Sequence, residues 1–120
     1  MTASPSEDRT ASHPLDAMTA SKANHSVMLE NDRVRVLDTW IAPGDRTDVH
    51  AHEWPSTLYI LSWSPFVRYD LAGNMLVDAR NLPSQPAAGS MLWSEPLPPH
   101  YVENVGDREL RVIAVELKGG

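Results

Sequence analysis

Hydrophobic and polar positions alternate in short segments along most of the chain. In "RVRV" (33–36) arginines and valines alternate with a period of two, which indicates a strand with one buried face. Further segments rich in β-branched and aromatic residues are "TLYIL" (57–61), "FVRYDL" (66–71), "SMLW" (90–93) and "LRVIAVEL" (110–117). The last of them is apolar on both faces apart from Arg111 and Glu116, as expected of a strand central in a packed sheet.

Clusters of Gly, Pro, Asn and Asp separate these segments, for example "APGD" (42–45) and "NVGD" (104–107). No segment carries the ten or so residues of helical periodicity that a parallel α/β sheet would need. Many short strands separated by turn residues are typical of a sandwich or barrel. The pattern therefore predicts an all-β fold.

Residues 1–26 differ from the remainder. They are rich in Ser, Thr, Ala and Asp and show almost no apolar periodicity. Such a segment cannot bury enough apolar surface to offset the entropy lost when it becomes ordered. The sequence predicts a flexible N-terminal arm over 1–26, with Leu15 and Met18 as points of docking on a neighbour, and a single barrel domain over 27–120.

Composition narrows the class of protein. A chain of 120 residues is large enough for one domain with a buried core. Its net charge of −6 argues against a nucleic-acid partner, which needs a basic face. The chain has no cysteine, which excludes disulfides and thiolate metal sites. No apolar segment approaches the ~20 residues that span a bilayer, and none resembles a signal peptide, so we expect a cytoplasmic protein without a membrane partner.

The segment "DVHAHEW" (48–54) carries a pair of histidines, His50 and His52, one residue apart. Residues i and i+2 of a strand point to the same side, so both imidazoles can reach one metal ion. A stable site needs a third protein ligand, and His100 in "PPHYVEN" is the only other histidine of the predicted barrel. An H-x-H pair on a strand is also common as a solvent-facing or hydrogen-bonded pair. The spacing alone therefore leaves metal binding open.

The segment "PGDRTDVHAHEWPSTLYILS" resembles the first motif of the cupin family, with Gly44 as the leading glycine and the histidine pair in register. The segment "GSMLWSEPLPPHYVEN" resembles the second motif, in which Gly89, His100 and Asn104 match its glycine, histidine and asparagine. The resemblance covers roughly residues 30–118. It implies a small single-domain cupin, a double-stranded β-helix or jelly-roll barrel with a metal pocket inside. It also implies a homodimer, because cupins usually pair through sheet edges.

The chain departs from the first motif at Ser56, which stands where the metal-binding glutamate is expected. The site implied by the resemblance therefore consists of three histidines, His50, His52 and His100. Such neutral ligands suit a divalent Fe, Zn, Ni or Cu ion. Some three-histidine cupins are iron dioxygenases, whereas other cupins without the glutamate hold no metal.

Strand parity predicts the walls of the pocket. If position 56 points inward, then Leu58 and Ile60 do so too. Trp93 and Tyr101 are candidates for the mouth, and Met91 for the interior. Arg68 would neutralise a substrate carboxylate if it faced inward, but a solvated charge on a strand is the alternative interpretation.

Three classes of function remain open. The first is a metalloenzyme acting on a small molecule, with an Fe(II)-type dioxygenase as the leading candidate and a lyase or isomerase as a further one. The second is a non-catalytic cupin that binds a small ligand, for example as a sensor. The third is a metal-free structural barrel. Fold resemblance does not identify a substrate, because one barrel hosts many chemistries.

Overall fold

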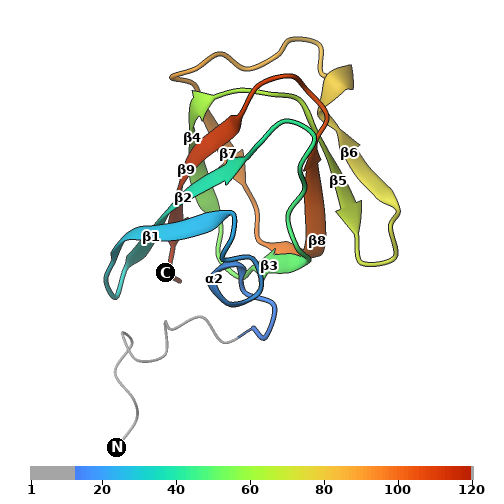
Figure 1. Ribbon diagram of the computed structural model, residues 1–120. Coiled ribbons are helices and arrows are strands. Elements are labelled where there is room, and N and C mark those ends of the chain that lie inside the picture. The colour runs from blue at the N-terminus through green and yellow to red at the C-terminus, as the bar shows by residue number, and fades with distance from the viewer. Residues whose placement is uncertain (1–12, 120) are drawn as a thin grey trace, which may run out of the picture.

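Two antiparallel β-sheets form the molecule in the computed structural model, which describes residues 13–119 (Figure 1). The five-stranded sheet has the order β1-β2-β9-β4-β7, and the four-stranded sheet has the order β3-β8-β5-β6. The first sheet contains β1 (His25–Glu30), β2 (Val34–Ile41), β9 (Leu110–Leu117), β4 (Ser56–Ser62) and β7 (Met91–Ser94). The second contains β3 (His50–His52), β8 (Leu97–Asn104), β5 (Phe66–Asp70) and β6 (Met75–Asp78). The prediction of an all-β jelly-roll barrel is confirmed.

Helices contribute little to the fold. The structure assigns one α-helix, α2 (Ala17–Ala20), and one 3₁₀ helix, η1 (Ala79–Asn81), within the described residues. No helix of this part of the chain is long and apolar enough to cross a membrane.

Strand β9 lies at the centre of the five-stranded sheet, between β2 and β4. It pairs with β2 from Val34↔Leu117 to Ile41↔Leu110, and with β4 from Ser56↔Glu116 onward. Its residues are mostly apolar, as the sequence predicted for a strand that is central in the sheet. Arg111 and Glu116 are the exceptions: Arg111 is exposed and pairs with Asp38, whereas buried Glu116 contributes to the candidate site.

The segment that the composition predicted to be a flexible arm is packed against the barrel from residue 13 onward. Helix α2 contacts β1 and β3 (Figure 1), and the amide of Ala51 donates a hydrogen bond of 2.6 Å to the carbonyl oxygen of Leu15. Ala17 is buried in a small apolar cluster with Leu37 and Ala114. This segment shows no apolar periodicity because its buried residues are small or polar. Residues 1–12 of the predicted arm lie outside the described residues.

Strand β1 also begins earlier than the predicted domain boundary, at His25 rather than Val27. Residues 24 and 25 are buried and hydrogen-bonded, with the side-chain amide of Asn24 donating to the carbonyl oxygen of Trp40. The register between β1 and β2 starts at His25↔Thr39. This pairing places an imidazole from the N-terminal segment in the barrel interior.

The two motif glycines lie in turns that require a positive φ. Gly44 has φ 78° and Gly89 has φ 87°, a backbone conformation that side chains with a Cβ rarely adopt. Gly44 precedes β3 and Gly89 precedes β7, so each glycine sets the chain direction into a strand that contributes to the interior. The motif asparagine has a different task, because buried Asn104 donates hydrogen bonds to the carbonyl oxygens of Ile41 and Arg108. It fixes the loops at one end of the barrel.

Polar groups occupy much of the interior. Among the described residues 14 polar or charged residues are buried, against 10 hydrophobic ones. Buried polar groups cost free energy unless they are hydrogen-bonded or paired. Many of them are paired, for example Arg35 with Asp16 and Glu116, and the histidines form a further group of buried polar side chains.

Candidate metal centre and adjoining cavity

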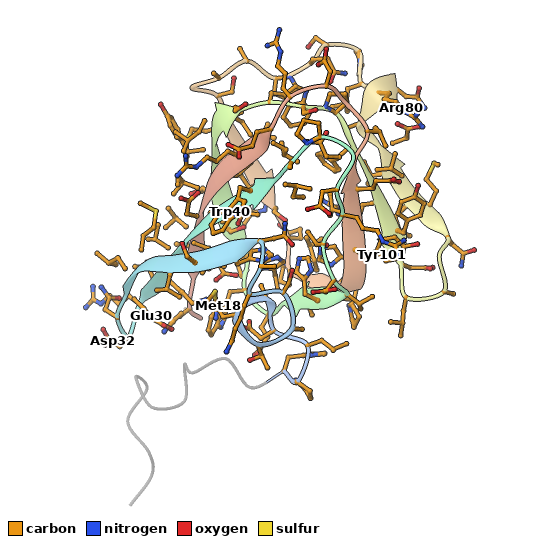
Figure 2. All side chains as sticks on the ribbon, in the orientation of Figure 1. Met18, Glu30, Asp32, Trp40, Arg80 and Tyr101 are labelled. Carbon is orange, nitrogen blue, oxygen red and sulfur yellow. The ribbon has the colours of Figure 1, made fainter. Side chains whose placement is uncertain are left out.

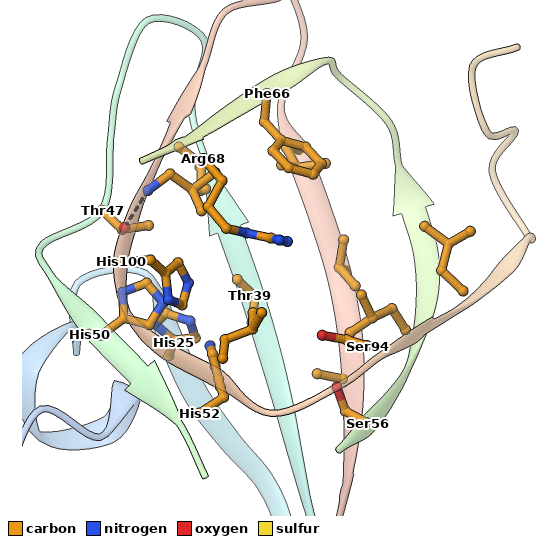
Figure 3. A pocket seen from close by; sticks show the side chains of 18 of the residues that line it. His25, Thr39, Thr47, His50, His52, Ser56, Phe66, Arg68, Ser94 and His100 are labelled. Atoms are coloured by element: carbon orange, nitrogen blue, oxygen red, sulfur yellow. Dashed lines mark hydrogen bonds between the residues drawn. The ribbon is translucent and has the colours of Figure 1, made fainter. Parts of the chain in front are cut away.

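Four buried or half-buried histidines converge inside the barrel (Figure 3). His50 and His52 come from β3, His100 from β8 and His25 from β1. His50 and His100 are direct partners across the antiparallel pair of strands, and their ring centroids lie 4.5 Å apart. The ring of His50 lies 4.8 Å from that of His25 and 5.0 Å from that of His52. Distant parts of the chain thus bring four imidazoles to one place.

Each of these imidazoles is anchored through its Nδ1 atom. The acceptor oxygens are Ser21 O for His25 (2.9 Å), Asp48 O for His50 (2.8 Å), Pro98 O for His100 (2.9 Å) and Glu116 Oε2 for His52 (3.0 Å). Carbonyl and carboxylate oxygens only accept hydrogen bonds, so every Nδ1 is the donor. In a neutral imidazole that carries its proton on Nδ1, the free lone pair is on Nε2. The Nε2 atom is then able to bind a metal ion.

The cluster differs in one member from the set predicted from the sequence. The ligand nitrogens of His25, His50 and His52 lie within 4.8 Å of one another, so these three residues could hold a metal ion. His100 of the predicted set is outside that group of three, but its ring adjoins that of His50. Sequence reasoning missed His25 because it follows a polar segment and belongs to neither cupin motif. Only the strand pairing of β1 with β2 reveals its place.

Burial keeps three of the four rings neutral. It lowers the pKa of His50 to about 2 and the pKa values of His25 and His100 to about 4, and neighbouring imidazoles and Arg68 contribute to the lowering. A neutral imidazole is the form that coordinates a metal ion, and no proton has to be displaced from it at neutral pH. The donor set therefore fits a divalent cation that accepts nitrogen ligands.

His52 is the first member of a series of ionic contacts that continues through Glu116 and Arg35 to Asp16. Glu116 accepts from His52 through one oxygen and from Arg35 Nε, at 2.6 Å, through the other. The guanidinium of Arg35 also donates two hydrogen bonds of 2.9 Å to Asp16, which caps α2. Burial raises the pKa of Glu116, but hydrogen bonds from His52 and Arg35 outweigh it and hold the pKa below its ordinary value. An ionised carboxylate therefore orients His52.

This carboxylate lies next to the position where the cupin motif carries its glutamate. Glu116 is the direct cross-strand partner of Ser56. The negative charge missing at Ser56 is thus present on the neighbouring strand, where it contacts Nδ1 of His52. A carboxylate that accepts from a ligating histidine fixes the ring and increases its basicity.

A cavity of about 410 Å³ opens beside the histidines. Small-molecule sites typically have volumes of about 300–1,000 Å³. Its walls are mostly apolar, and the polar lining residues include Thr39, Thr47, Ser94 and Arg68. Figure 3 shows the histidines on one side of this cavity and Ser56 and Ser94 on another.

Four of the six predicted pocket residues line the cavity: Ser56, Leu58, Ile60 and Trp93. Met91 does not, and 56% of its surface is exposed. Tyr101 also lies elsewhere, on β8 between two lining residues (Figure 2), so its side chain points to the opposite face and stacks on Tyr69 at 4.8 Å. Neither residue lines the cavity: strand parity turns the side chain of Tyr101 away, and Met91 lies directly opposite the exposed Tyr59 of β4.

No protein-family profile matches the chain, and no curated protein sequence matches it. Solved structures do resemble it. A cupin-domain protein from Bordetella pertussis Tohama I has a TM-score of 0.64 and 23% identity, over 79% of this chain and 92% of that one.

Two further solved structures resemble it at a TM-score of 0.55. A double-stranded β-helix protein from Klebsiella pneumoniae is 21% identical, over 80% of this chain and 76% of that one. An RmlC-like cupin protein from Methanocaldococcus jannaschii is 10% identical, over 78% of each chain. The protein is therefore a small cupin-fold protein, a double-stranded β-helix, as the two motifs predicted.

Proposed function

We propose that the protein binds one divalent metal ion in the histidine cluster and uses it on a small molecule held in the adjoining cavity. His50 and His52 are the central ligands, and His25 and His100 complete the set. The observation that carries the proposal is the anchoring of all four Nδ1 atoms on oxygen acceptors, which leaves Nε2 free on each converging ring. A merely structural histidine needs no such common arrangement.

A divalent ion on neutral imidazoles supplies Lewis acidity or, with iron, the activation of dioxygen. The residues of the chain supply position and surroundings. Glu116 holds His52 in one orientation, while the apolar wall keeps bulk water from the bound molecule. Glu95 is the only acidic residue that lines the cavity in the described part of the chain, and its carboxylate accepts a hydrogen bond from Trp93.

The cavity lining has few side chains that could act as a general acid or base, which favours a metal-centred reaction. With Glu95 engaged and the histidines serving as ligands, the lining offers no free carboxylate for general acid–base catalysis. Chemistry centred on the ion, with an Fe(II)-type dioxygenase as the first candidate and a lyase or isomerase as the second, fits this lining best. Turnover is tested by measuring dioxygen consumption and product formation with the iron-loaded protein on small organic acids and ketones.

Variants at His25 and His100 test whether each of these histidines is a metal ligand in addition to His50 and His52. His25→Ala and His100→Ala should each weaken metal binding in a titration against a competing chelator, because each removes one nitrogen ligand. His13→Ala is the matched control, since His13 lies outside the cluster and its Nδ1 accepts from the amide of Leu15. Unchanged affinity in His25→Ala would restrict the site to the three histidines predicted from the sequence.

A non-catalytic ligand-binding protein is the second candidate, and the volume and apolar lining of the cavity favour it. A binder keeps its small molecule after the metal is removed by a chelator, whereas the proposed metal-dependent site loses activity. Calorimetric titration of one ligand before and after chelation separates these two functions.

A further inference from the structure

Arg68 places a positive charge in the wall of the cavity. It belongs to β5, and its cross-strand neighbours are Val102 of β8 and Val77 of β6. Its side chain lines the cavity, and Figure 3 shows the guanidinium extending from β5 into the space between the histidines and Phe66. The guanidinium carbon lies 5.7 Å from the centre of the Phe66 ring. Arg68 therefore faces inward, whereas the sequence was also compatible with a solvated position.

This arginine has no carboxylate partner among residues 13–119. None of the ion pairs formed there includes it, and its Nε is shielded from solvent without a hydrogen-bond acceptor. Three other arginines, Arg35, Arg80 and Arg111, are each paired with a carboxylate. Burial lowers the pKa of Arg68, but a guanidinium remains protonated in proteins.

Arg68 is half-buried, and a charge that is partly removed from water without a partner costs free energy. A ligand of opposite charge would offset this cost. We propose that Arg68 binds the carboxylate of a small organic acid, so that the cavity is a site for a carboxylate with a short apolar body. The fork of the guanidinium matches the two oxygens of a carboxylate. The inference deepens the proposed small-molecule function and rests on it.

The remaining walls match such a ligand. Apolar residues line the cavity and would pack on the ligand body; they include Ile41, Leu58, Ile60, Phe66, Leu110 and Val112. The hydroxyls of Ser56 and Ser94 lie across the cavity and can hydrogen-bond a polar group at the other end of the ligand. An acid bound by Arg68 thus presents the atoms near its carboxylate to the histidine side.

The number of cations favours a carboxylate over a phosphate. Arg68 is the only lysine or arginine that lines the cavity within the described residues. A single guanidinium neutralises the one charge of a carboxylate, whereas a phosphate carries about two negative charges at neutral pH and is usually bound by more donors.

Titration calorimetry on the metal-free and metal-loaded protein tests the inference with matched probes. The probes are 3-phenylpropanoate, hexanoate, the amides of both acids, and phenylphosphonate. We expect each acid to bind at least tenfold more tightly than its amide, because a hydrogen bond from the guanidinium to a charged carboxylate is stronger than one to a neutral amide. Arg68→Met should abolish this difference, and Arg68→Lys should leave an intermediate one, since lysine keeps the charge but loses the fork.

The control is Arg108→Met, which removes an exposed arginine that does not line the cavity and should preserve the preference for acids. Equal binding of acids and amides, binding of neither, or tighter binding of phenylphosphonate would overturn the inference. Metal content is measured on the same samples. A wild-type protein that holds metal but shows no preference for acids refutes the role of Arg68 alone, whereas a protein without metal refutes the metal centre.

Discussion

Glu116 joins the histidine cluster to the ionic contacts behind it. It is fully buried, and its two oxygens contact His52 and Arg35. Removing one partner of a buried ionic contact lowers the free energy of unfolding, because the other charge remains buried and unpaired. The residue therefore has two effects, one on the orientation of His52 and one on the stability of the barrel.

Replacing this carboxylate by an amide tests the first effect. We expect Glu116→Gln to lower metal affinity about 10- to 100-fold, the usual consequence of removing a carboxylate that accepts from a ligating histidine. A chelator-competition titration measures the change, and a thermal melt shows that the variant is folded. Glu109→Gln, which alters an exposed carboxylate, should leave affinity unchanged. Equal affinities in both variants would contradict the role given to Glu116.

The neutral histidines predict how the stability of the metal-free protein depends on pH. The pKa values of His25 and His100 are about 4 in the folded chain and about 6.5 in the unfolded chain. Between these values the unfolded chain binds more protons, so the free energy of unfolding falls as the pH falls from about 6.5 to about 4. Each group contributes about 1.4 kcal/mol per pH unit. Urea titrations at pH 7.5, 6 and 5 measure this trend, and a constant midpoint would refute it.

At the scale of elements, the segment from His13 through β1 is part of the site. It contributes His25 to the cluster, and Asp16 ties α2 to Arg35 of β2 through two hydrogen bonds. Helix α2 has only four residues, too few to be stable alone, so its position depends on these contacts.

Removing the charge of Asp16 should loosen this segment. We expect Asp16→Asn to speed hydrogen exchange at the amides of Thr19, Ala20 and Ser21, which donate to the carbonyl oxygens of Asp16 and Ala17, and to weaken metal binding through His25. Asp78→Asn is the matched control, because Asp78 also caps a short helix and pairs with an arginine, but far from the cluster. Equal exchange rates in the wild type and Asp16→Asn would refute the coupling.

Strands β2, β4, β5, β7 and β9 could be predicted from the sequence because each is rich in apolar, β-branched or aromatic residues and lies between turn residues, whereas β1, β6 and β8 were not predicted. The histidine pair could also be placed, since residues i and i+2 share a face of a strand. His25, Arg68 and Glu116 could not be assigned in this way. Their roles depend on which strands become neighbours, and local pattern does not encode the pairing of β1 with β2 or of β4 with β9.

At the scale of the whole molecule, large apolar side chains remain exposed on the five-stranded sheet. Val27, Met28 and Leu29 lie on the edge strand β1. A second group, Tyr59, Leu61 and Met91, lies on the neighbouring strands β4 and β7 at the other edge, where Tyr59 and Met91 are direct partners. A contiguous exposed apolar surface commonly marks a protein interface. We propose that the protein forms a homodimer through this sheet.

Light scattering tests the dimer. The wild type should have twice the chain mass of 13.3 kDa, and Leu61→Lys combined with Met91→Lys should yield monomers. The control is Leu71→Lys in the β5–β6 turn, an even more exposed leucine outside this sheet, which should leave the mass unchanged. A wild-type mass of one chain would contradict the proposal.

The most direct test of the metal centre is the metal content of protein purified without a histidine tag and reconstituted with Fe(II) or Zn(II). We predict one ion per chain in the wild type and in His13→Ala, and none in the double variant His50→Ala/His52→Ala. If the wild type retains no more metal than the double variant, the histidine cluster is not a metal site.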